Sequence, residues 1–365
     1  MIVMNDFKAE PAELRSAMAA AADRVFASGW YVLGKELQAF EQQWAAICGT
    51  AHCLGVGNGM DAIELALRAL DIGPGSEVIT TPMTAFATVL AILRAGAEPV
   101  LADIDPASGI LSPASVERCL SERTRAVVLV HLYGQMRDMP NWVDLVRKAG
   151  VHLIEDCAQS HMARSDQGVA GSFGSAGAYS FYPTKNLGAI GDGGALVTQS
   201  DAIARRVARL RNYGQSERYV HPELGMNSRL DELQAALLSE RLRWLEAFTE
   251  RRRAIAHRYD ETIDNPRIAL LAPPQQPSAH VHHLYVVRCD ERERLSRHMA
   301  DAGVQTLIHY PVPVHRQAPC AALRRDPLGL AQAEAHAASC LSVPCHPQMS
   351  DADVGQVVAA LGAFR

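Results

Sequence analysis

Short apolar runs alternate with helical patterns between about residues 53 and 198 of this chain. The runs that predict buried strands lie at residues 78–80, 99–101, 126–130, 152–154, 178–181 and 195–197. Residues 61–70 predict a helix, because Ile63, Ala66, Leu67 and Leu70 fall on one helical face. Strands that alternate with helices indicate an α/β fold with a mostly parallel sheet covered on both faces. Ligands of such sheets bind at the carboxyl ends of the strands.

The pattern changes in the last third of the chain. Residues 237–259 predict a long helix, and a proline-rich loop follows at residues 272–277. A smaller α/β segment then continues to residue 365. We therefore predict a large domain over residues 1–245, which includes an N-terminal arm, and a small C-terminal domain over residues 246–365.

Three histidines, His280, His282 and His283, lie in or beside residues 281–287, which predict a strand. Side chains along a strand point alternately to its two faces, so these histidines cannot all meet one metal ion. A second group of possible ligands consists of Cys340, Cys345, His336 and His346. The spacing of these residues does not match that of zinc ligand pairs. We predict no metal site.

Composition excludes several classes of protein. The net charge of −5 and the pI near 6.3 argue against nucleic-acid binding, which requires a basic excess. The most apolar stretch, residues 85–93, ends at Arg94 and is too short to span a bilayer. The N-terminus lacks the pattern of a signal peptide, and the eight cysteines form no CxxC pair. These features predict a cytoplasmic globular protein with reduced thiols.

Two residues suggest the chemistry. Lys185 lies between an apolar strand and the glycine-rich run 191–194, where a partly desolvated amine can act as a nucleophile toward an aldehyde. Asp156 lies at the carboxyl end of the strand near residue 154, although an aspartate there can also simply cap a helix. A lysine that binds an aldehyde and an acid that pairs with a pyridinium nitrogen are what pyridoxal phosphate (PLP) needs from a protein.

Further residues are candidates for the same cofactor. The run 55–62, rich in glycine, precedes a helix and suits a phosphate, although it is also compatible with a plain tight turn. Phe86 follows a strand and can stack on the pyridine ring, or it is a core phenylalanine. Gln159 is placed to donate to the phenolic oxygen and Ser180 to meet the phosphate.

The order and spacing of these motifs resemble the sugar aminotransferases of the DegT/DnrJ/StrS family, which are fold type I PLP enzymes. The resemblance covers nearly the whole chain. It is carried by the motifs at residues 57–62, 84–88, 131–134, 155–161, 181–187, 193–195, 211–214, 224–230 and 309–311. It implies a mostly parallel sheet of the seven-stranded type in the large domain.

The resemblance also implies residue roles. Lys185 resembles the lysine that binds PLP and shuttles the proton, Asp156 the partner of the ring nitrogen, and Gln159 the ligand of the phenolic oxygen. The other implied residues are the phosphate ligands Gly59, Met60 and Ser180, the asparagine Asn227, and the substrate-side residues Arg229, His309, Tyr310 and His315. Asn227 matches an asparagine that enters the neighbouring subunit's site, so a homodimer with shared active sites is implied. Where Met60 stands, the family often has a hydroxyl, so only the backbone amide of Met60 can bind the phosphate.

The expected activity is transamination of a nucleotide-linked keto-6-deoxyhexose, with a dTDP nucleotide, a ketone at C3 or C4, and L-glutamate as the amino donor. A PLP-dependent sugar dehydratase on the same scaffold is a competing hypothesis, but those relatives have histidine in place of the lysine at position 185. A cyclitol aminotransferase and a non-enzymatic regulatory protein are also compatible with the resemblance, and the regulatory protein would stay colourless when purified.

Overall fold

The computed structural model describes residues 1–365. Its α-helices are α1 (Ala12–Ser28), α2 (Lys35–Cys48), α3 (Gly59–Ala69), α4 (Phe86–Arg94), α5 (Pro113–Cys119), α6 (Met139–Ala149), α7 (Asp201–Leu210), α8 (Glu232–Thr262), α9 (Arg292–Asp301), α10 (Ala331–Ser339) and α11 (Asp351–Ala363). Its strands are β1 (His52–Val56), β2 (Glu77–Thr80), β3 (Glu98–Leu101), β4 (Thr124–Val130), β5 (His152–Asp156), β6 (Arg164–Ser165), β7 (Gly168–Val169), β8 (Ala176–Ser180), β9 (Gly194–Thr198), β10 (Ala269–Leu270), β11 (Tyr285–Arg288) and β12 (Cys340–Val343). None of the helices is both long and apolar enough to cross a membrane.

Seven strands form the large sheet, in the order β1-β9-β8-β5-β4-β2-β3. All neighbouring pairs from β8 to β3 are parallel, whereas β9 runs antiparallel to both β1 and β8. The predicted α/β fold with a mostly parallel seven-stranded sheet is therefore confirmed. Each of the six apolar runs that predict strands overlaps one strand of this sheet.

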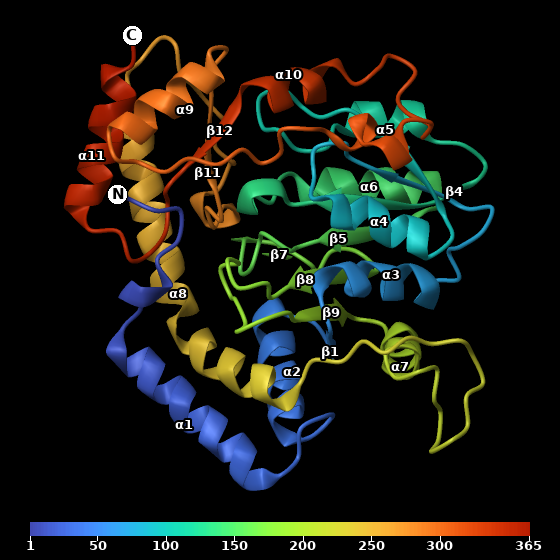
Figure 1. Cartoon of the computed structure of the whole chain (residues 1–365). Coiled ribbons are helices and arrows are strands. Elements are labelled where there is room, and N and C mark those ends of the chain that lie inside the picture. The colour runs from blue at the N-terminus through green and yellow to red at the C-terminus, as the bar shows by residue number, and fades with distance from the viewer.

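Helices cover both faces of this sheet. Along β4, Val127 and Leu129 pack in one buried cluster with α2, α5 and α6, while Ala126 and Val128 pack in another with α3 and α7. Both faces of the strand are apolar because each faces a helical layer. Figure 1 shows β5, β8 and β9 in the middle of the molecule with α3 and α7 beside them.

A second, three-stranded antiparallel sheet has the order β10-β11-β12. It packs with α9, α11 and the C-terminal half of α8 in a separate apolar cluster. Figure 1 shows these elements together at the upper left, and α8 running from the large sheet into them. The boundary predicted between residues 245 and 246 thus lies within α8. Ile2 also joins this cluster and pairs with Val304.

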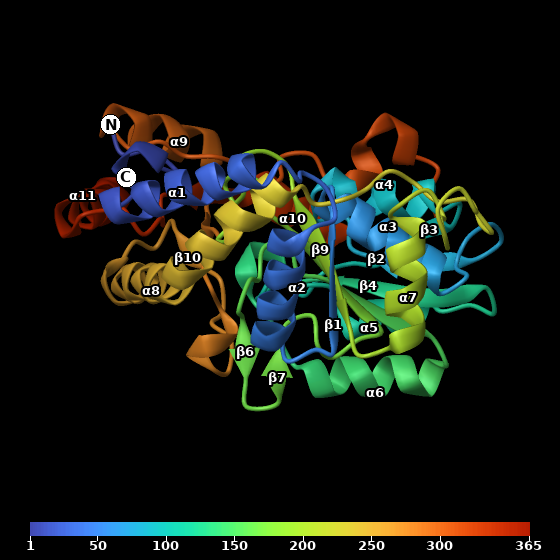
Figure 2. The ribbon, with the colours of Figure 1, turned by 90° about the horizontal axis from the view of Figure 1, so that it is seen from below.

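The segment between β11 and β12 returns to the large sheet. Leu101 of the edge strand β3 forms a parallel bridge with Arg325, through backbone hydrogen bonds from Leu101 to Arg324 and from Asp326 to Leu101. The Asp326 carboxylate also accepts hydrogen bonds from Arg118 of α5, at 3.0 Å to its Nε. Figure 2 shows the large sheet from below, with α6 on one side and α4 and α7 on the other.

The strand predicted over residues 281–287 is wrong in its first half, because β11 begins only at Tyr285. His282 has a φ of 42°, which interrupts an extended chain. The backbone amides of Val281 and Leu284 instead donate to the carbonyls of Gly134 and Tyr133, after the end of β4. Long-range backbone hydrogen bonds to residues 133 and 134 of the large domain therefore replace sheet pairing in this segment.

Candidate active site

The predicted site residues gather at the carboxyl edge of the parallel strands. Asp156 is the last residue of β5, Ser180 is the last residue of β8, and Lys185 follows five residues after Ser180. Gly59 begins α3 directly after β1, and Phe86 begins α4 after β2. The parallel order brings these ends together although the residues are far apart in the chain.

Asp156 is buried, with 6% of its surface exposed, and its carboxylate is held from two sides. Oδ2 accepts a hydrogen bond of 2.8 Å from the hydroxyl of Thr88, and Oδ1 accepts one of 3.1 Å from the amide of Ala158. The Thr88 hydroxyl in turn lies 2.8 Å from that of Thr84. Asp156 is thus a buried carboxylate of fixed orientation, as expected of a partner for a ring cation.

Lys185 is partly buried near this carboxylate. Burial lowers the pKa of Lys185 from 10.5 to about 8, and the charge of Asp156 opposes this change. An amine with such a pKa is unprotonated in an appreciable fraction near neutral pH, and only the unprotonated form attacks an aldehyde.

An anion cradle lies at the N-terminus of α3. The Asn58 side chain caps the amide of Asp61 at 2.8 Å, which leaves the amides of Gly59 and Met60 without a partner. A Cβ added at Gly59 would lie 2.7 Å from the Cβ of Ser180, so only glycine lets the helix start approach the Ser180 hydroxyl. Free amides at a helix N-terminus beside a hydroxyl suit a phosphate group.

The orientation of Gln159 follows from its neighbours. Its Oε1 accepts a hydrogen bond of 2.6 Å from the backbone amide of Tyr133, so its amino group must point the other way. Nε2 donates to the hydroxyl of Tyr310 at 3.2 Å. Gln159 is therefore a donor on the side of the site where Tyr310 lies. Burial raises the pKa of Tyr310 to about 12, helped by the charge of Asp156, so the phenol stays protonated.

Three histidines near Lys185 are kept neutral. Burial and the charge of Lys185 lower the pKa of His161 to about 3 and that of His309 to about 4. The same two causes hold the pKa of His283 well below its usual value. His283 Nδ1 lies 3.2 Å from the Asn186 carbonyl oxygen, and the Asn186 amino group donates to the carbonyl of Val281. The residue after Lys185 thus ties the lysine loop to the 281–283 segment.

Other predicted residues lie apart from Lys185. Asn227 is exposed, next to Ser228, whose hydroxyl accepts from the amide of Gly57 at 3.0 Å. Arg229 donates to Asn212 at 3.0 Å and lies over the ring of Tyr213.

His315 is buried and lies 2.9 Å from Glu334 of α10. None of these contacts of Asn227, Arg229 and His315 includes Lys185 or Asp156.

The sequence did not single out Thr88, Asn186 or His283 as site residues. Thr88 stands in the run 84–88, and Asn186 follows Lys185 directly, so both lie in motifs that carry the family resemblance. Their partners, however, are distant in the chain. Only the fold shows that Thr88 contacts Asp156 and that Asn186 contacts His283.

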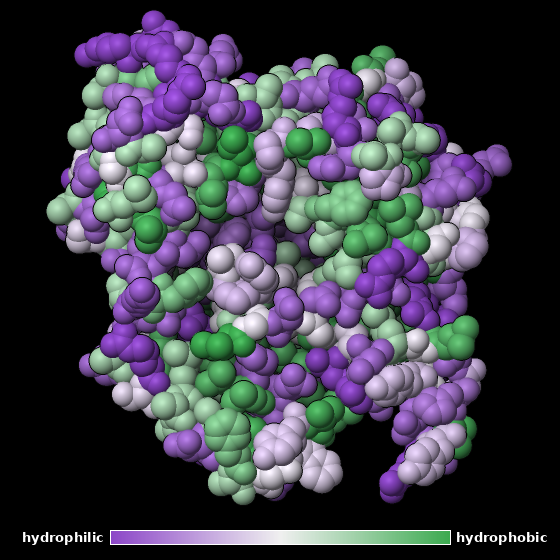
Figure 3. Space-filling model, in the orientation of Figure 1, coloured by the Kyte–Doolittle hydropathy of each residue, from purple (hydrophilic) through white to green (hydrophobic).

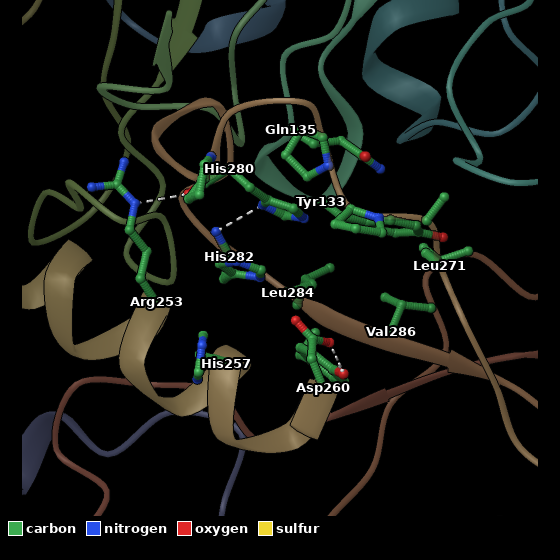
Figure 4. Close-up of a pocket in the computed structure, with 15 residues that line it drawn as sticks. Tyr133, Gln135, Arg253, His257, Asp260, Leu271, His280, His282, Leu284 and Val286 are labelled. Carbon is green, nitrogen blue, oxygen red and sulfur yellow. Dashed lines mark hydrogen bonds between the residues drawn. The ribbon is translucent and has the colours of Figure 1, made fainter. Parts of the chain in front are cut away.

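A separate cavity of 290 Å³ is lined in part by His280, His282 and Leu284, from the segment that carries His283. Figure 4 shows His280 and His282 in its wall, with Arg253, His257 and Asp260 from α8. The rings of His280 and His282 stack at 3.8 Å. None of the predicted site residues lines this cavity, so it is distinct from the candidate active site.

The residues at the carboxyl edge fit PLP. The Gly59 cradle, which a Cβ would fill, matches its phosphate, Asp156 its ring nitrogen, Gln159 its phenolic oxygen and Lys185 its aldehyde. When bound, PLP supplies an aldehyde that captures amino groups and a protonated ring that withdraws electrons from the reacting carbon.

Comparison with known proteins points to an aminotransferase. The model of the DegT/DnrJ/EryC1/StrS aminotransferase family matches residues 12–362. The erythromycin biosynthesis sensory transduction protein EryC1 of Saccharopolyspora erythraea is 46% identical over 360 residues, which are 98% of each chain. The dTDP-3-amino-3,4,6-trideoxy-alpha-D-glucose transaminase of Streptomyces venezuelae is 44% identical over 98% of this chain and 94% of its own.

Solved structures are similar over the whole length. The crystal structure of S. venezuelae DesV in complex with a ketimine intermediate has a TM-score of 0.94 and 42% identity, covering 99% of this chain and 97% of that one. A Bacillus subtilis protein, NtdA, solved with bound PMP, has a TM-score of 0.88 and 25% identity, covering 97% of this chain and 82% of its own.

Proposed function

Because the chain belongs to the DegT/DnrJ/EryC1/StrS aminotransferase family, we propose that it transfers an amino group to a nucleotide-linked keto-6-deoxyhexose. PLP is its cofactor. The observation that carries the proposal is the pairing of a lysine amine of lowered pKa, Lys185, with the anchored carboxylate of Asp156, beside the anion cradle at Gly59.

Each residue has a separate task. Asp156 keeps the proton on the ring nitrogen, because its carboxylate is buried, oriented and anionic. Gly59, Met60 and Ser180 bind the phosphate through two backbone amides and one hydroxyl, Gln159 donates to the phenolic oxygen, and Phe86 covers the ring. Nζ of Lys185 would move the proton between the substrate carbon and the aldehyde carbon of the cofactor, which a pKa of about 8 permits in both directions.

The substrate is a dTDP-linked sugar with a ketone at C3, and the amino donor is L-glutamate. The S. venezuelae relative, 44% identical, is named for a dTDP-3-amino sugar, which favours C3 over C4. His309 and Tyr310 lie near Lys185 and Gln159, so they are the substrate-side residues on this chain.

The active unit is a homodimer that shares its sites. Large apolar side chains are exposed in the last turn of α1, in the α1–α2 connection and in the loop after α7, among them Phe26, Trp30, Tyr31, Tyr219 and Leu224. These segments form the lower edge of the molecule in Figure 1, and Figure 3 shows hydrophobic side chains mixed with pale and hydrophilic ones along that edge. Asn227, exposed near this loop, would reach the phosphate of the second copy.

The test starts from the protein converted to its pyridoxamine phosphate form. This form is mixed with a panel of nucleotide keto sugars that differ in nucleotide and in ketone position, and with a cyclitol ketone. We expect a dTDP-linked 3-keto sugar to restore the absorbance of lysine-bound PLP, and Lys185→Ala to abolish both that band and turnover. Restoration only by the cyclitol ketone, or by no ketone, would contradict the proposed substrate.

A sugar dehydratase and a regulatory protein make different predictions. A sugar dehydratase would remove a hydroxyl group from the sugar and form no amino sugar, and the dehydratase relatives on this scaffold carry histidine where Lys185 stands. One relative, 46% identical, is named as a sensory transduction protein. A purely regulatory role would require neither PLP nor the amine of Lys185, so a colourless purified protein would favour it.

A further inference from the structure

We propose that Thr88 and Thr84 are positioning residues for the cofactor, acting through Asp156. Their two hydroxyls fix the direction of this carboxylate. The inference rests on the cofactor site of the proposed function, but it does not depend on the identity of the sugar or of the amino donor.

The three side chains form a buried chain of hydrogen bonds. Thr84 Oγ1 lies 2.8 Å from Thr88 Oγ1, and Thr88 Oγ1 lies 2.8 Å from Asp156 Oδ2. Thr84 is 4% exposed and Thr88 is 1% exposed, so water does not replace these contacts. A hydrogen bond to a charged group contributes more to stability within a buried network than at the surface.

When Asp156 is ionised, only one assignment of donors and acceptors satisfies the Thr84–Thr88–Asp156 hydrogen bonds. An ionised Asp156 can only accept, so Thr88 donates its hydroxyl proton to Oδ2. The oxygen of Thr88 is then free to accept from Thr84. The amide of Ala158 donates to Oδ1, so each of the two carboxylate oxygens accepts one hydrogen bond.

The hydroxyl of Thr88 is directed away from its own helix. A threonine in a helix often donates to a backbone carbonyl one turn earlier. Thr88 in the first turn of α4 donates instead to Asp156 on β5. The α4 N-terminus has no side-chain cap, so neither threonine is engaged in capping this helix.

The same helical turn begins with Phe86, the candidate for stacking on the cofactor ring. Phe86 and Thr88 are therefore fixed relative to each other by one turn of backbone. The first turn of α4 thus places both the residue over the ring face and the hydroxyl that orients the partner of the ring nitrogen. The partial positive charge at this helix N-terminus further favours the anionic carboxylate.

The experiment compares PLP binding by apoprotein variants. Thr88→Val keeps the shape and removes the hydroxyl, Thr88→Ser keeps the hydroxyl, and Thr84→Val removes only the second link. Two quantities are measured for each: the dissociation constant of PLP, and the pH dependence of the absorbance of lysine-bound PLP. Circular dichroism and the melting temperature of each apoprotein report folding.

We expect Thr88→Val to raise the PLP dissociation constant about tenfold to a hundredfold, the range for losing a hydrogen bond to a charged group. Its absorbance titration should shift from that of the native protein. Thr84→Val should weaken binding about twofold to fivefold, consistent with the loss of a neutral hydrogen bond, and Thr88→Ser should stay within about twofold.

The inference is overturned if Thr88→Val binds PLP as the native protein does and titrates at the same pH. If Thr88→Val does not fold, native affinity and titration in a folded Thr84→Val overturn it equally. Failure of the native chain to transaminate the sugar panel would contradict the proposed substrate alone, because PLP binding is measured without sugar or donor.

Discussion

Gly59 at the start of α3 and Ser180 at the end of β8 approach so closely that a methyl group does not fit between them. A Cβ built at Gly59 would lie 2.7 Å from the Ser180 Cβ and 3.1 Å from its Cα. The helix amides and the serine hydroxyl can therefore converge on one anion, and the glycine is required for this convergence.

Gly59→Ala should weaken PLP binding about tenfold, because either α3 or β8 must move and the cradle opens. Pyridoxal, which lacks the phosphate, should bind native and variant apoprotein equally, and fluorescence titration compares the two ligands. Gly57→Ala is a matched control, since its Cβ would meet the nearest atom, Ser228 Oγ, at 3.4 Å. Equal losses of affinity for both ligands would indicate general damage instead of a lost phosphate contact.

The capture of PLP by the apoprotein should become faster as the pH rises through about 8. Burial lowers the pKa of Lys185 to about 8, and only the unprotonated amine attacks the aldehyde. Stopped-flow absorbance measures the rate, which should level off above the pKa. A rate that keeps rising to pH 10.5 would mean that the lysine has an ordinary pKa.

The same shift predicts how stability depends on pH. The folded pKa of Lys185 lies below the unfolded value of 10.5, so the unfolded chain binds more protons between about pH 8 and 10.5. The free energy of unfolding therefore increases as the pH rises across this window, which means that the folded protein becomes more stable. Lys185→Met should lack this increase, and denaturant unfolding of both apoproteins at several pH values measures the difference.

Asp156→Asn should weaken PLP binding at least as much as Thr88→Val does, and at saturating PLP it should lose most of the transamination rate. An amide cannot keep the ring nitrogen protonated, so the ring withdraws fewer electrons from the reacting carbon. We expect the half-reaction with L-glutamate to slow by about 10²–10³, the cost typical of losing one electrostatic contact at the reacting centre. Rapid-scan absorbance follows this half-reaction, and a native rate would remove Asp156 from the assigned role.

Two inactive variants should complement each other. Asn227→Ala and Lys185→Ala each damage every site of a homodimer that shares its residues. A mixed dimer would contain one site with Lys185 of one copy and Asn227 of the other, both intact. Co-expression with two different affinity tags isolates the mixed dimer, and activity in it but in neither parent supports the shared site. An inactive mixed dimer would place Asn227 outside the neighbouring site.

The parts of this molecule that local sequence determines were predicted well. The strands of the large sheet follow from continuous apolar runs, since both of their faces are buried, as at Val127 and Val128. Asp156 and Lys185 could be proposed as site residues from the sequence because each lies beside such a strand.

The parts that depend on tertiary contacts were not predicted. The strand predicted over residues 281–284 is absent because these residues bond to Gly134 and Tyr133. Similarly, the hydroxyl of Thr88 could donate to a carbonyl of its own helix or to Asp156. Only the tertiary structure, which brings α4 next to the end of β5, shows that it donates to Asp156.

The contact that Arg324, Arg325 and Asp326 make with Leu101 has a consequence for biosynthesis. Strand β3 lies at the margin of the large sheet, and this late segment bonds the outward amide and carbonyl of Leu101. While the chain is being translated, that margin stays open and can pair with other nascent chains. We expect aggregation during expression to depend on how quickly the last part of the chain arrives, and slower production at low temperature or added chaperones to increase the yield of folded protein.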